Sequence, residues 1–319
     1  MKNPALTSTH TVILRSDFVS INRSRINEYA KSLARSPKFS VPTWDYSSHF
    51  YDPMHASRTL DYLFLLDALN FCFWSPKETR WHFTFQKKKY NGYYALSLAL
   101  KDFFEQHPLV RLQDFAKISF KDFSLIFQGG KNLLFLKERW QIARSVARTI
   151  EKKGGTVKFV GAAKGRFTKL VPAIAYEIPS FRDEGNYKGS PVFFWKRAQI
   201  LAGDIYGTFR GQGIGSFKDI NYLTAFADYK IPQILYHFGM MEYAPSLKLS
   251  IEKFSRLKPG SPEEIEIRSA TIWTVEFLRE ALLALGITIS AFELDWLLWN
   301  KSQNIILDFP HHRTKTIFY

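Results

Sequence analysis

The sequence predicts a mostly α-helical protein with a small β element, and three observations support this fold class. Apolar residues recur at helical spacing along most of the chain. The one clear alternation of apolar and polar residues is short, in RWHFTFQ at residues 80–86. The hydrophobic content of 46% and charged content of 23% are those of a globular protein. The 319 residues are enough for one large domain or two tightly joined ones.

Helices and one strand are predicted in the first half of the chain. The first helix is basic and amphipathic, and the second is apolar nearly all round, so it should be buried. RWHFTFQ, with KKKYNG after it, is predicted to be one strand of a small sheet closed by a turn. The last of these helices should stop at Gly154-Gly155. The predicted helices span Ile21–Leu33, Thr59–Phe73, Tyr93–Gln106 and Asn132–Lys152.

The second half is predicted to be mainly helical. Ser261-Pro262-Glu263-Glu264 has the features of a helix start, because Ser can cap free N–H groups, Pro fits the first turn and acids suit the positive end. Pro232 also fits a first turn, which indicates a break just before it. The predicted helices span Gly165–Ile178, Val192–Thr208, Ile220–Ala227, Pro232–Met241, Pro245–Arg256, Pro262–Leu285 and Ala291–Ser302.

Composition restricts the partners and the compartment. The net charge of +15 favours anionic partners, although the basic residues are spread along the chain as on a solvated surface. Cys72 is the single cysteine, so no disulfide can form within the chain, which fits a reducing compartment. No apolar run reaches the ~18 residues of a membrane span, and no signal peptide is visible. We therefore expect a cytoplasmic protein that does not enter a membrane.

Several catalytic motifs are absent from the sequence. There is no P-loop and no G-x-S-x-G elbow, and GQGIG at residues 211–215 lacks the preceding strand and third glycine of a dinucleotide fingerprint. His311 and His312 are adjacent, so they cannot both face one metal ion from a regular helix or strand. These absences argue against ATPases, serine hydrolases, NAD enzymes and metallohydrolases.

Asp228, in FADYKIPQIL, is an acid among apolar residues. A buried unpaired carboxylate is costly, so this residue needs a partner or a function. If a helix begins near Pro232, Asp228 lies just outside its positive end, where a carboxylate keeps its negative charge at neutral pH. Two interpretations remain open: an acid that merely caps the helix, and a working acid in a pocket.

Other candidate residues also have a structural and a functional interpretation. Lys196 and Arg197 could grip a phosphate or could be two solvated cations of an amphipathic helix. Asp295 precedes Trp296, with Asn300 a turn further on, so this acid could bind a base edge while a ring stacks on the base. Alternatively, Asp295 is one paired acid of a core helix. His49 could serve a phosphate, a hydroxyl or a proton transfer, or could be satisfied structurally.

Eight ordered segments of the chain resemble the queuosine salvage protein family. Their order and spacing match from about Trp44 onward, whereas residues 1–43 match weakly. The segments are LDALNFCFWSPKE, YNGYYAL, SFRDE, FFWKRAQILAGD, GSFKDINYLTAFADYKIPQIL, EIEIRSATIWTVE, ELDWLLWN and PHHRTKTIFY. We therefore expect a variable N-terminal segment over residues 1–43 and one compact catalytic unit over 44–319. Within that unit, a small β-containing part should cover about 74–130 and a helical, glycosylase-like part about 131–319.

The resemblance implies an architecture and an activity. It implies a mostly α protein similar to the helix–hairpin–helix DNA glycosylases. It further implies release of queuine from queuosine 5′-monophosphate, leaving ribose 5-phosphate, with no metal or organic cofactor. We expect a monomer whose partner is this small nucleotide, and neither a nucleic acid polymer nor a membrane.

The resemblance also implies functional residues. The family's catalytic aspartate, in its F-A-D-Y motif, falls on Asp228, and the aromatic of that motif falls on Phe226. Its base-binding acid falls on Asp295, with the neighbouring ring at Trp296, and its histidine ahead of the first buried helix falls on His49. The chain departs from the family at one contact to the base, because it has Asn300 where members often carry an acid.

The chemistry of the reaction fits these residues. Breaking an N-glycosidic bond builds positive charge on the sugar, which an ionised carboxylate such as Asp228 can stabilise or attack. Queuine is a 7-deazaguanine and has no N7 to protonate, so help must come at O6, N3 or the N1/N2 edge, where Asp295 could act. Lys196 and Arg197 are the candidates for the 5′-phosphate.

Two alternative functions follow from the same sequence. The charge of +15 and the GQGIG hairpin also fit a helix–hairpin–helix protein that binds nucleic acid, or a glycosylase that acts on a polymer. A noncatalytic helical scaffold is the third possibility. A pocket closed over one nucleotide would favour the first function, and an open basic groove the second.

Overall fold

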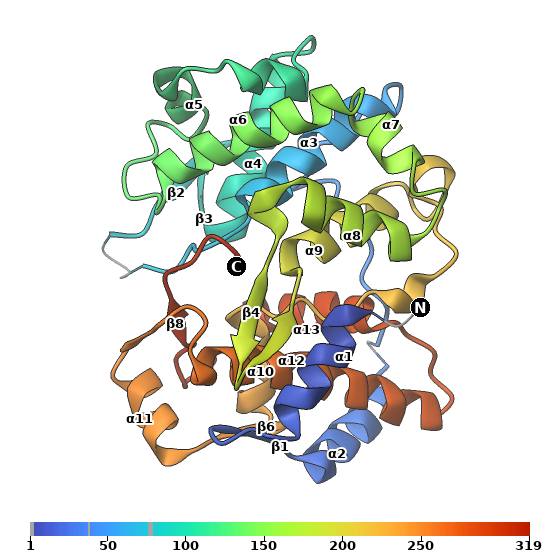
Figure 1. Cartoon of the computed structure of the whole chain (residues 1–319), viewed down its shortest axis with the longest axis vertical. Coiled ribbons are helices and arrows are strands. Elements are labelled where there is room, and N and C mark those ends of the chain that lie inside the picture. Colours follow the sequence, from blue (N-terminus) through green and yellow to red (C-terminus); the bar gives the residue numbers. More distant parts are fainter. Residues whose placement is uncertain (1–2, 38, 76–78) are drawn as a thin grey trace.

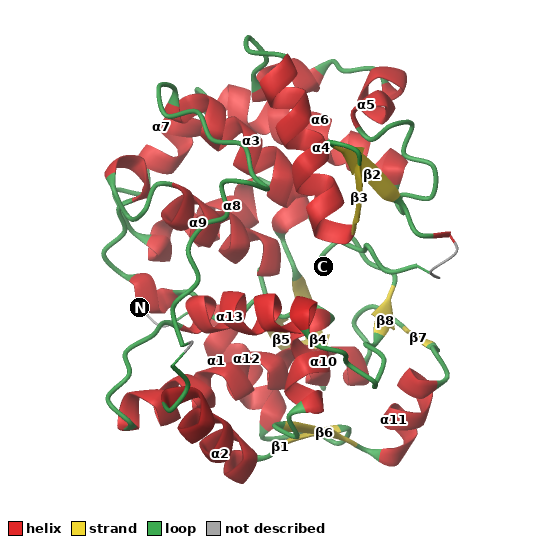
Figure 2. Cartoon of the chain, turned by 180° about the vertical axis from the view of Figure 1, so that it is seen from behind, coloured by secondary structure: helices red, strands yellow, loops and turns green. Residues whose placement is uncertain are grey.

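The computed structural model describes residues 3–37, 39–75 and 79–319, and most of them are helical. Figure 1 shows two helical halves, one above the other, and Figure 2 shows helix α13 lying across the molecule between them. The upper half contains β2 (His82–Phe85), β3 (Lys88–Asn91), α3 (Ala56–Leu69), α4 (Gly92–Gln106), α5 (Phe120–Ile126), α6 (Leu136–Lys152), α7 (Thr156–Gly161), α8 (Phe167–Glu177) and α9 (Lys196–Thr208).

The lower half is formed by both ends of the chain. Helices from the N-terminal region pack there against helices from the C-terminal third (Figure 1). Its helices are α1 (Pro4–Ile13), α2 (Arg23–Ala34), α10 (Lys230–His237), α11 (Pro245–Glu252), α12 (Pro262–Ala284) and α13 (Ala291–Asn304). Its strands are β1 (Val19–Ile21), β4 (Glu184–Tyr187), β5 (Ser190–Phe193), β6 (Met241–Tyr243), β7 (Arg256–Leu257) and β8 (Arg313–Thr314).

The strands of the described residues form two-stranded sheets. β1–β6, β2–β3 and β4–β5 are antiparallel, and β7–β8 is parallel. In the β2–β3 hairpin, Gln86 and Lys87 have left-handed φ angles of 47° and 65°, which allow a two-residue turn. The prediction of a mostly α fold with a small β element is therefore confirmed, including the strand in RWHFTFQ.

Helix α3 is buried all round, as its apolar sequence predicts. It ends at Leu69 and not at Phe73, because the Arg139 guanidinium of α6 donates to the carbonyl oxygens of Leu69 and Phe71. These long-range hydrogen bonds satisfy backbone groups that a further helical turn would otherwise pair. Even with this apolar helix, none of the described helices is both long and apolar enough to cross a membrane.

Two predicted helices in the middle of the chain are wrong in part or entirely. The helix predicted over Val192–Thr208 begins at Lys196, because Trp195 has a left-handed φ of 48° and the preceding residues pair in the β4–β5 hairpin. Ile220–Ala227 is not an α-helix. It is a single 3-10 turn (η5, Ile220–Tyr222) followed by extended backbone.

The remaining helix predictions are confirmed, with shifts of a few residues at some ends. The helix predicted from Asn132 begins at Leu136, because Phe135 is left-handed with φ 60°. The one predicted to reach Met241 ends at His237, where Gly239 with φ 69° leads into β6. The Ser261 cap is confirmed, since its side chain accepts a hydrogen bond from the Glu264 N–H.

The core consists of a large upper cluster and a lower cluster. Leu223 and Phe226 pack in the upper cluster, Ala225 packs in the lower one, and Ala227 packs in a small third cluster that includes Phe194. A short extended segment, residues 223–227, therefore runs along the boundary between the cores. Asp228 follows this segment directly.

The N-terminal segment contacts the rest of the protein. α1 and α2 pack on α12, and β1 pairs with β6. Asn3 caps α1 and also donates a hydrogen bond to the Tyr222 carbonyl oxygen at 2.7 Å. The division of the chain at residue 43 remains a prediction.

A buried ion pair connects α12 to the segments around residues 183 and 227. The Arg268 guanidinium forms two hydrogen bonds with the Asp183 carboxylate, one of them 2.9 Å long, and each side chain is 3% exposed. Arg268 Nε also donates to the Ala227 carbonyl oxygen at 3.2 Å. The guanidinium lies 3.8 Å from the Phe194 ring centroid and 4.3 Å from that of Tyr319.

We expect Asp183→Asn to lower the free energy of unfolding by about 3 kcal/mol, because the buried Arg268 charge then keeps only the Glu264 carboxylate, 3.5 Å away, as an acidic partner. The measurement is urea unfolding followed by circular dichroism. Glu28→Gln is the matched control: it removes an ion pair with Arg25 whose side chains are 58% and 54% exposed, and it should cost less than about 1 kcal/mol. Equal losses in the two variants would contradict the structural role of the buried pair.

Candidate active site

The backbone before Asp228 is extended because side chains, and not a helix, bind its polar groups. The Thr224 N–H donates to Gln199 Oε1 at 3.0 Å, and the Phe226 N–H donates to Asp295 Oδ1 at 2.8 Å. The carbonyl oxygen of Ala227 accepts from Arg268. Buried N–H and C=O groups need such partners, and here α9, α12 and α13 supply them.

Asp228 caps α10 with one of its two carboxylate oxygens. Oδ1 accepts hydrogen bonds from the Lys230 N–H at 2.7 Å and the Ile231 N–H at 2.8 Å. No described residue donates a hydrogen bond to the other oxygen, Oδ2. The two interpretations open from the sequence are therefore compatible, because the cap occupies one oxygen and leaves the other for a ligand.

Burial and neighbouring charges act in opposite directions on Asp228. Burial raises the pKa of this carboxyl above its usual value, whereas Lys196 and the two N–H groups at the start of α10 lower it. The sequence predicts a fully ionised acid from the helix end alone. The structure shows two effects on the pKa of Asp228 that the sequence does not reveal. Burial raises this pKa, and the charge of Lys196 lowers it.

Lys196 and Arg197 are neighbours in the sequence but have different surroundings. Lys196 is 5% exposed, and its ammonium lies within electrostatic range of Asp228, Asp295 and Asp67. The Arg197 guanidinium instead donates to the backbone carbonyl oxygens of Asp67, Ala68 and Ser180. Arg197 is thus committed to backbone groups, while Lys196 faces acids.

Asp295 of α13 joins this cluster. It is 4% exposed, and its Oδ1 holds the Phe226 N–H. Burial and the nearby Asp228 raise the pKa of Asp295 well above its usual value, against the opposing effect of Lys196. A carboxyl in such surroundings favours its protonated form, which can donate a hydrogen bond.

Trp296, Asn300 and Phe226 have three different surroundings. Trp296 packs closely on α9, where a Cβ at Gly207 would lie 2.7 Å from the indole ring, so only glycine fits there. Asn300 is exposed, and its carbonyl oxygen accepts a hydrogen bond from Asn304. The Phe226 ring is buried in the upper core against Gly203.

His49 is held on both ring nitrogens. Nδ1 lies 2.7 Å from the Asp45 carbonyl oxygen, so this nitrogen carries the proton, and Nε2 accepts from the Tyr93 hydroxyl at 2.8 Å. Trp44 packs on the imidazole with 4.3 Å between ring centroids. With both nitrogens occupied, His49 positions Tyr93 and Trp44, which lie near Trp299 and Trp296 respectively.

Two acids that sequence reasoning missed lie near Lys196. Asp67 of α3 is fully buried, its oxygens accept no hydrogen bond in the described structure, and burial raises its pKa to about 8. Asp204 of α9 is 3% exposed, and burial together with Asp67 raises its pKa well above its usual value. The spacing from Lys196 to Asp204, about two helical turns, was a signal that could have identified the second acid.

The arrangement places several carboxyl groups around one ammonium group. A single ammonium, Lys196, lies among carboxyl groups from α3, α9, α13 and the segment before α10. Within the described residues, no three His, Cys, Asp or Glu side chains are arranged to hold a metal ion. Four carboxyl groups therefore compete for the positive charge of Lys196. Because one ammonium cannot balance four negative charges, some of these carboxyl groups are protonated and others ionised.

Comparison with known proteins identifies the class. A sequence profile described as "Queuosine salvage protein" matches residues 49–319, and the chain belongs to this family. A relative from Sphaerobacter thermophilus is 41% identical, over 98% of this chain and 97% of its own length. Relatives from Dictyostelium discoideum and Mus musculus are 37% and 33% identical, over 82% and 90% of this chain and 78% and 90% of their own. All three carry the name queuosine 5′-phosphate N-glycosylase/hydrolase.

The buried neutral state of His49 predicts a loss of stability in acid. Burial lowers the pKa of His49 to about 4 from about 6.5 in an unfolded chain. The unfolded state therefore binds the proton more readily, so this contribution to stability is complete above about pH 6.5 and is lost as the pH falls toward 4. The loss from this group should be on the order of 3 kcal/mol.

Urea unfolding at several pH values between 7 and 4.5 measures this effect. His311 and His312 also have pKa values lowered by burial, to about 4 and about 3, so the wild type alone does not isolate His49. His49→Gln should have a lower stability at pH 7 and a weaker dependence on pH. An identical dependence in the variant would contradict the neutral, hydrogen-bonded state of His49.

Proposed function

We propose that the protein hydrolyses the N-glycosidic bond of queuosine 5′-monophosphate, releasing queuine and ribose 5-phosphate for queuine salvage into tRNA. The observation that carries this proposal is Asp228: two N–H groups hold one carboxylate oxygen, and the other accepts no hydrogen bond from the described residues. Membership of the queuosine salvage family and the names of the relatives support the choice of reaction and substrate.

Asp228 acts at the sugar in this proposal. As the bond breaks, the anomeric carbon and ring oxygen gain positive charge, and a carboxylate fixed beside them stabilises that charge without having to reorient. The cap on α10 holds the carboxylate in place, and Lys196 favours its ionised form. Water then adds to the anomeric carbon, either directly or after a covalent bond between Asp228 and the sugar.

Asp295 acts at the base. The departing queuine carries negative charge and has no N7 to accept a proton, so a donor at O6 or N3 assists its departure. Asp295 fits this role because its Oδ1 is occupied by the Phe226 N–H and its surroundings favour the protonated form. Trp296 offers a ring for stacking on the base, and Asn300 a neutral polar group near it.

We also propose a finer architecture. α9, the glycine-containing turn at residues 211–215 and α10 would correspond to the helix–hairpin–helix element of DNA glycosylases, with the extended segment 223–228 inserted before the second helix. The compact catalytic unit would cover residues 44–319. Consistent with the lack of any disulfide partner for Cys72, we propose a monomeric protein of the cytoplasm that acts on a free nucleotide.

The test is incubation of the purified protein with queuosine 5′-monophosphate, queuosine nucleoside or modified tRNA, with free queuine measured by mass spectrometry. We expect queuine from the monophosphate. Asp228→Asn should reduce its release by about 10³-fold or more, because it removes the charge that faces the sugar. Asn retains an oxygen for the Lys230 and Ile231 N–H groups, so the variant should unfold at nearly the wild-type urea concentration. A folded variant with normal turnover would refute the mechanism.

Asp295→Asn distinguishes the two roles proposed for Asp295, which are donating a proton to the base and accepting a hydrogen bond from the Phe226 N–H. The amide oxygen can still hold the Phe226 N–H, but the proton is lost, so turnover should fall by about 10²- to 10⁴-fold. The active form of Asp295 is protonated, so the wild-type rate should fall as the pH rises through its elevated pKa. The residual rate of the variant should lack this alkaline decline. The same alkaline limb in both proteins would exclude Asp295 as the donor.

A further inference from the structure

The positive charge of the chain is concentrated in the upper half. Residues 80–177, which run from just before β2 to the end of α8, contain 19 Lys or Arg and 7 Asp or Glu. Their net charge of +12 makes up most of the +15 of the whole chain. Because the fold gathers this part of the chain at one end of the molecule (Figure 1), the basic residues are not spread evenly over the surface. A strongly basic region favours an anionic partner.

Helix α6 carries the most regular row of these charges. Arg144, Arg148 and Lys152 follow Lys137 by 7, 11 and 15 residues, a spacing that places all four on one face of a helix. Lys137, Arg148 and Lys152 are exposed, and Arg144 is half-buried. We call these four cations the α6 stripe. The opposite face lies in the upper core, and its buried residues are Arg139, Ile142, Ala143, Val146, Ala147 and Ile150.

Two arginines of the α6 stripe are held in place by one backbone group. Arg144 Nε and Arg148 Nη2 donate to the Ala116 carbonyl oxygen at 3.2 and 3.3 Å. The Arg144 guanidinium also lies 4.8 Å from the Trp140 ring centroid. Each guanidinium uses one of its five N–H donors in these hydrogen bonds, which orients the group and leaves the other donors for a ligand. The exposed Lys117 follows Ala116 directly and adds a further charge beside them.

The α6 stripe has no acidic partner within the described ranges. None of its four side chains forms an ion pair with a described residue, although Glu138 and Glu151 belong to the same helix. By contrast, Lys153, one residue beyond α6, pairs with Glu177. The stripe extends over about 22 Å, because 15 residues of helix rise by about 1.5 Å each. A row of uncompensated charge of this length suits an extended polyanion.

A nucleic acid backbone fits the α6 stripe better than a membrane does. Each strand of a duplex presents a phosphate about every 3.4 Å along its axis, so a row of this length meets several phosphates in succession. A guanidinium group can donate to two phosphate oxygens at once. An amphipathic helix that binds a membrane inserts its apolar face into the lipid. The apolar face of α6 is instead buried in the protein core.

Gln141 indicates RNA rather than DNA. It lies between Lys137 and Arg144 on the same face of α6, it is exposed, and its amide forms no hydrogen bond with a described residue. An amide can both donate to and accept from a 2′-hydroxyl, which is the group that distinguishes RNA from DNA. In double-helical RNA these hydroxyls line the wide, shallow minor groove, where a protein surface can reach them together with the phosphates.

We infer that the α6 stripe binds a double-helical stem of tRNA, with its arginines and lysines on the phosphates and Gln141 on a 2′-hydroxyl. The choice of tRNA among RNAs rests on the proposed function, whose product returns to tRNA. The bound tRNA is a partner and not the substrate. The core face of α6 packs on α3, which carries Asp67, so the stripe lies on the side away from that acid of the site. The active site still acts on a free nucleotide.

The test measures binding of an unmodified tRNA transcript, which contains no queuosine, by fluorescence anisotropy at several KCl concentrations. For the wild type, the logarithm of the association constant should fall against that of the salt concentration with a slope of about −3 to −4, as four phosphate contacts require. Lys137→Gln/Lys152→Gln should bind at least about tenfold more weakly, with a slope smaller by about two. Both lysines are exposed, so this variant should unfold at the wild-type urea concentration. Unchanged binding by the folded variant would overturn the inference.

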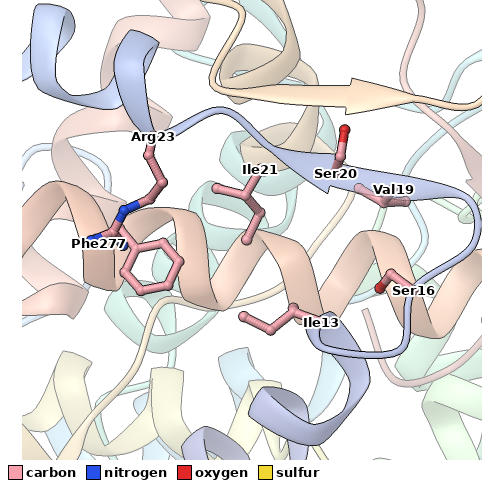
Figure 3. Close-up of a pocket in the computed structure, with 7 residues that line it drawn as sticks. All are labelled: Ile13, Ser16, Val19, Ser20, Ile21, Arg23 and Phe277. Carbon is pink, nitrogen blue, oxygen red and sulfur yellow. The ribbon is translucent and has the colours of Figure 1, made fainter.

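The control removes the same charge from the lower half. Arg23 lines a surface groove of about 490 Å³ between β1 and α12, and its guanidinium lies 3.5 Å from the Phe277 ring centroid (Figure 3). Arg23 and Arg25 are both exposed. Arg23→Gln/Arg25→Gln lowers the net charge by two, as the test variant does, and should bind tRNA as the wild type does. Equal losses in the two variants would show general attraction by the charge of +15 and would overturn the inference.

Two further ligands decide the kind of partner. An RNA duplex with the sequence of one tRNA stem should bind several-fold more tightly than the DNA duplex of the same sequence, and Gln141→Ala should remove this difference. Vesicles that contain phosphatidylserine should bind more weakly than the transcript. Equal binding of the two duplexes by the wild type would overturn the assignment to RNA. Tighter binding of the vesicles, lost in Lys137→Gln/Lys152→Gln, would overturn it in favour of a membrane surface.

Turnover separates this inference from the proposed function. Lys137→Gln/Lys152→Gln should release queuine from queuosine 5′-monophosphate at the wild-type rate, and excess transcript should not inhibit the wild type. If the wild type releases no queuine yet binds the RNA duplex through the α6 stripe, the proposed function fails and the RNA-binding surface stands. If queuine is released and the stripe variant binds tRNA normally, the RNA-binding surface fails. Competitive inhibition by the transcript would place the RNA in the active site and would also overturn the inference.

Discussion

The geometry of the site depends on the buried ion pair between Arg268 and Asp183. Arg268 holds the Ala227 carbonyl oxygen directly before Asp228. Asp183 accepts hydrogen bonds through its backbone oxygen from Phe194 and Trp195, and through its carboxylate from the Lys196 N–H. One ion pair thus connects the start of α9, which carries Lys196, to the segment that carries Asp228. The cost of burying two charges is offset because nearly all of their hydrogen-bonding groups have partners.

The extended segment 223–227 explains how an acid can lie at the boundary of two cores. A helix would satisfy its own backbone and require no other partners, whereas an extended segment requires partners from its neighbours. Gln199, Asp295 and Arg268 meet this requirement, so the backbone is fixed from α9, α13 and α12 at once. Among the described residues, only Oδ1 of Asp295 accepts a hydrogen bond, as is also the case for Asp228 at the start of α10. Each acid is thus held in place through one carboxylate oxygen.

The acids of the site lie beside a group of aromatic rings. Asp295 is followed on α13 by Trp296, whose ring centroid lies 6.4 Å from that of Trp44. Asp228 and Lys196 lie close enough to Asp295 for their charges to affect its pKa. His49 packs on Trp44 and is hydrogen-bonded to Tyr93, and both of its ring nitrogens are occupied. The site therefore combines buried acids with flat aromatic surfaces.

The sequence by itself determined the local features and the family. The Ser261 cap, the buried helix α3, the RWHFTFQ strand and the position of Asp228 before a helix that contains Pro232 in its first turn all follow from patterns of a few residues. The tertiary structure alone decided that residues 223–227 are extended, that Arg197 binds carbonyl oxygens, and that Asp67 and Asp204 lie near Lys196. The physical reason is that caps and apolar periodicity act between neighbours in the chain. Hydrogen bonds from distant side chains to the backbone leave no comparable local pattern, although they can override the helical preference of a segment.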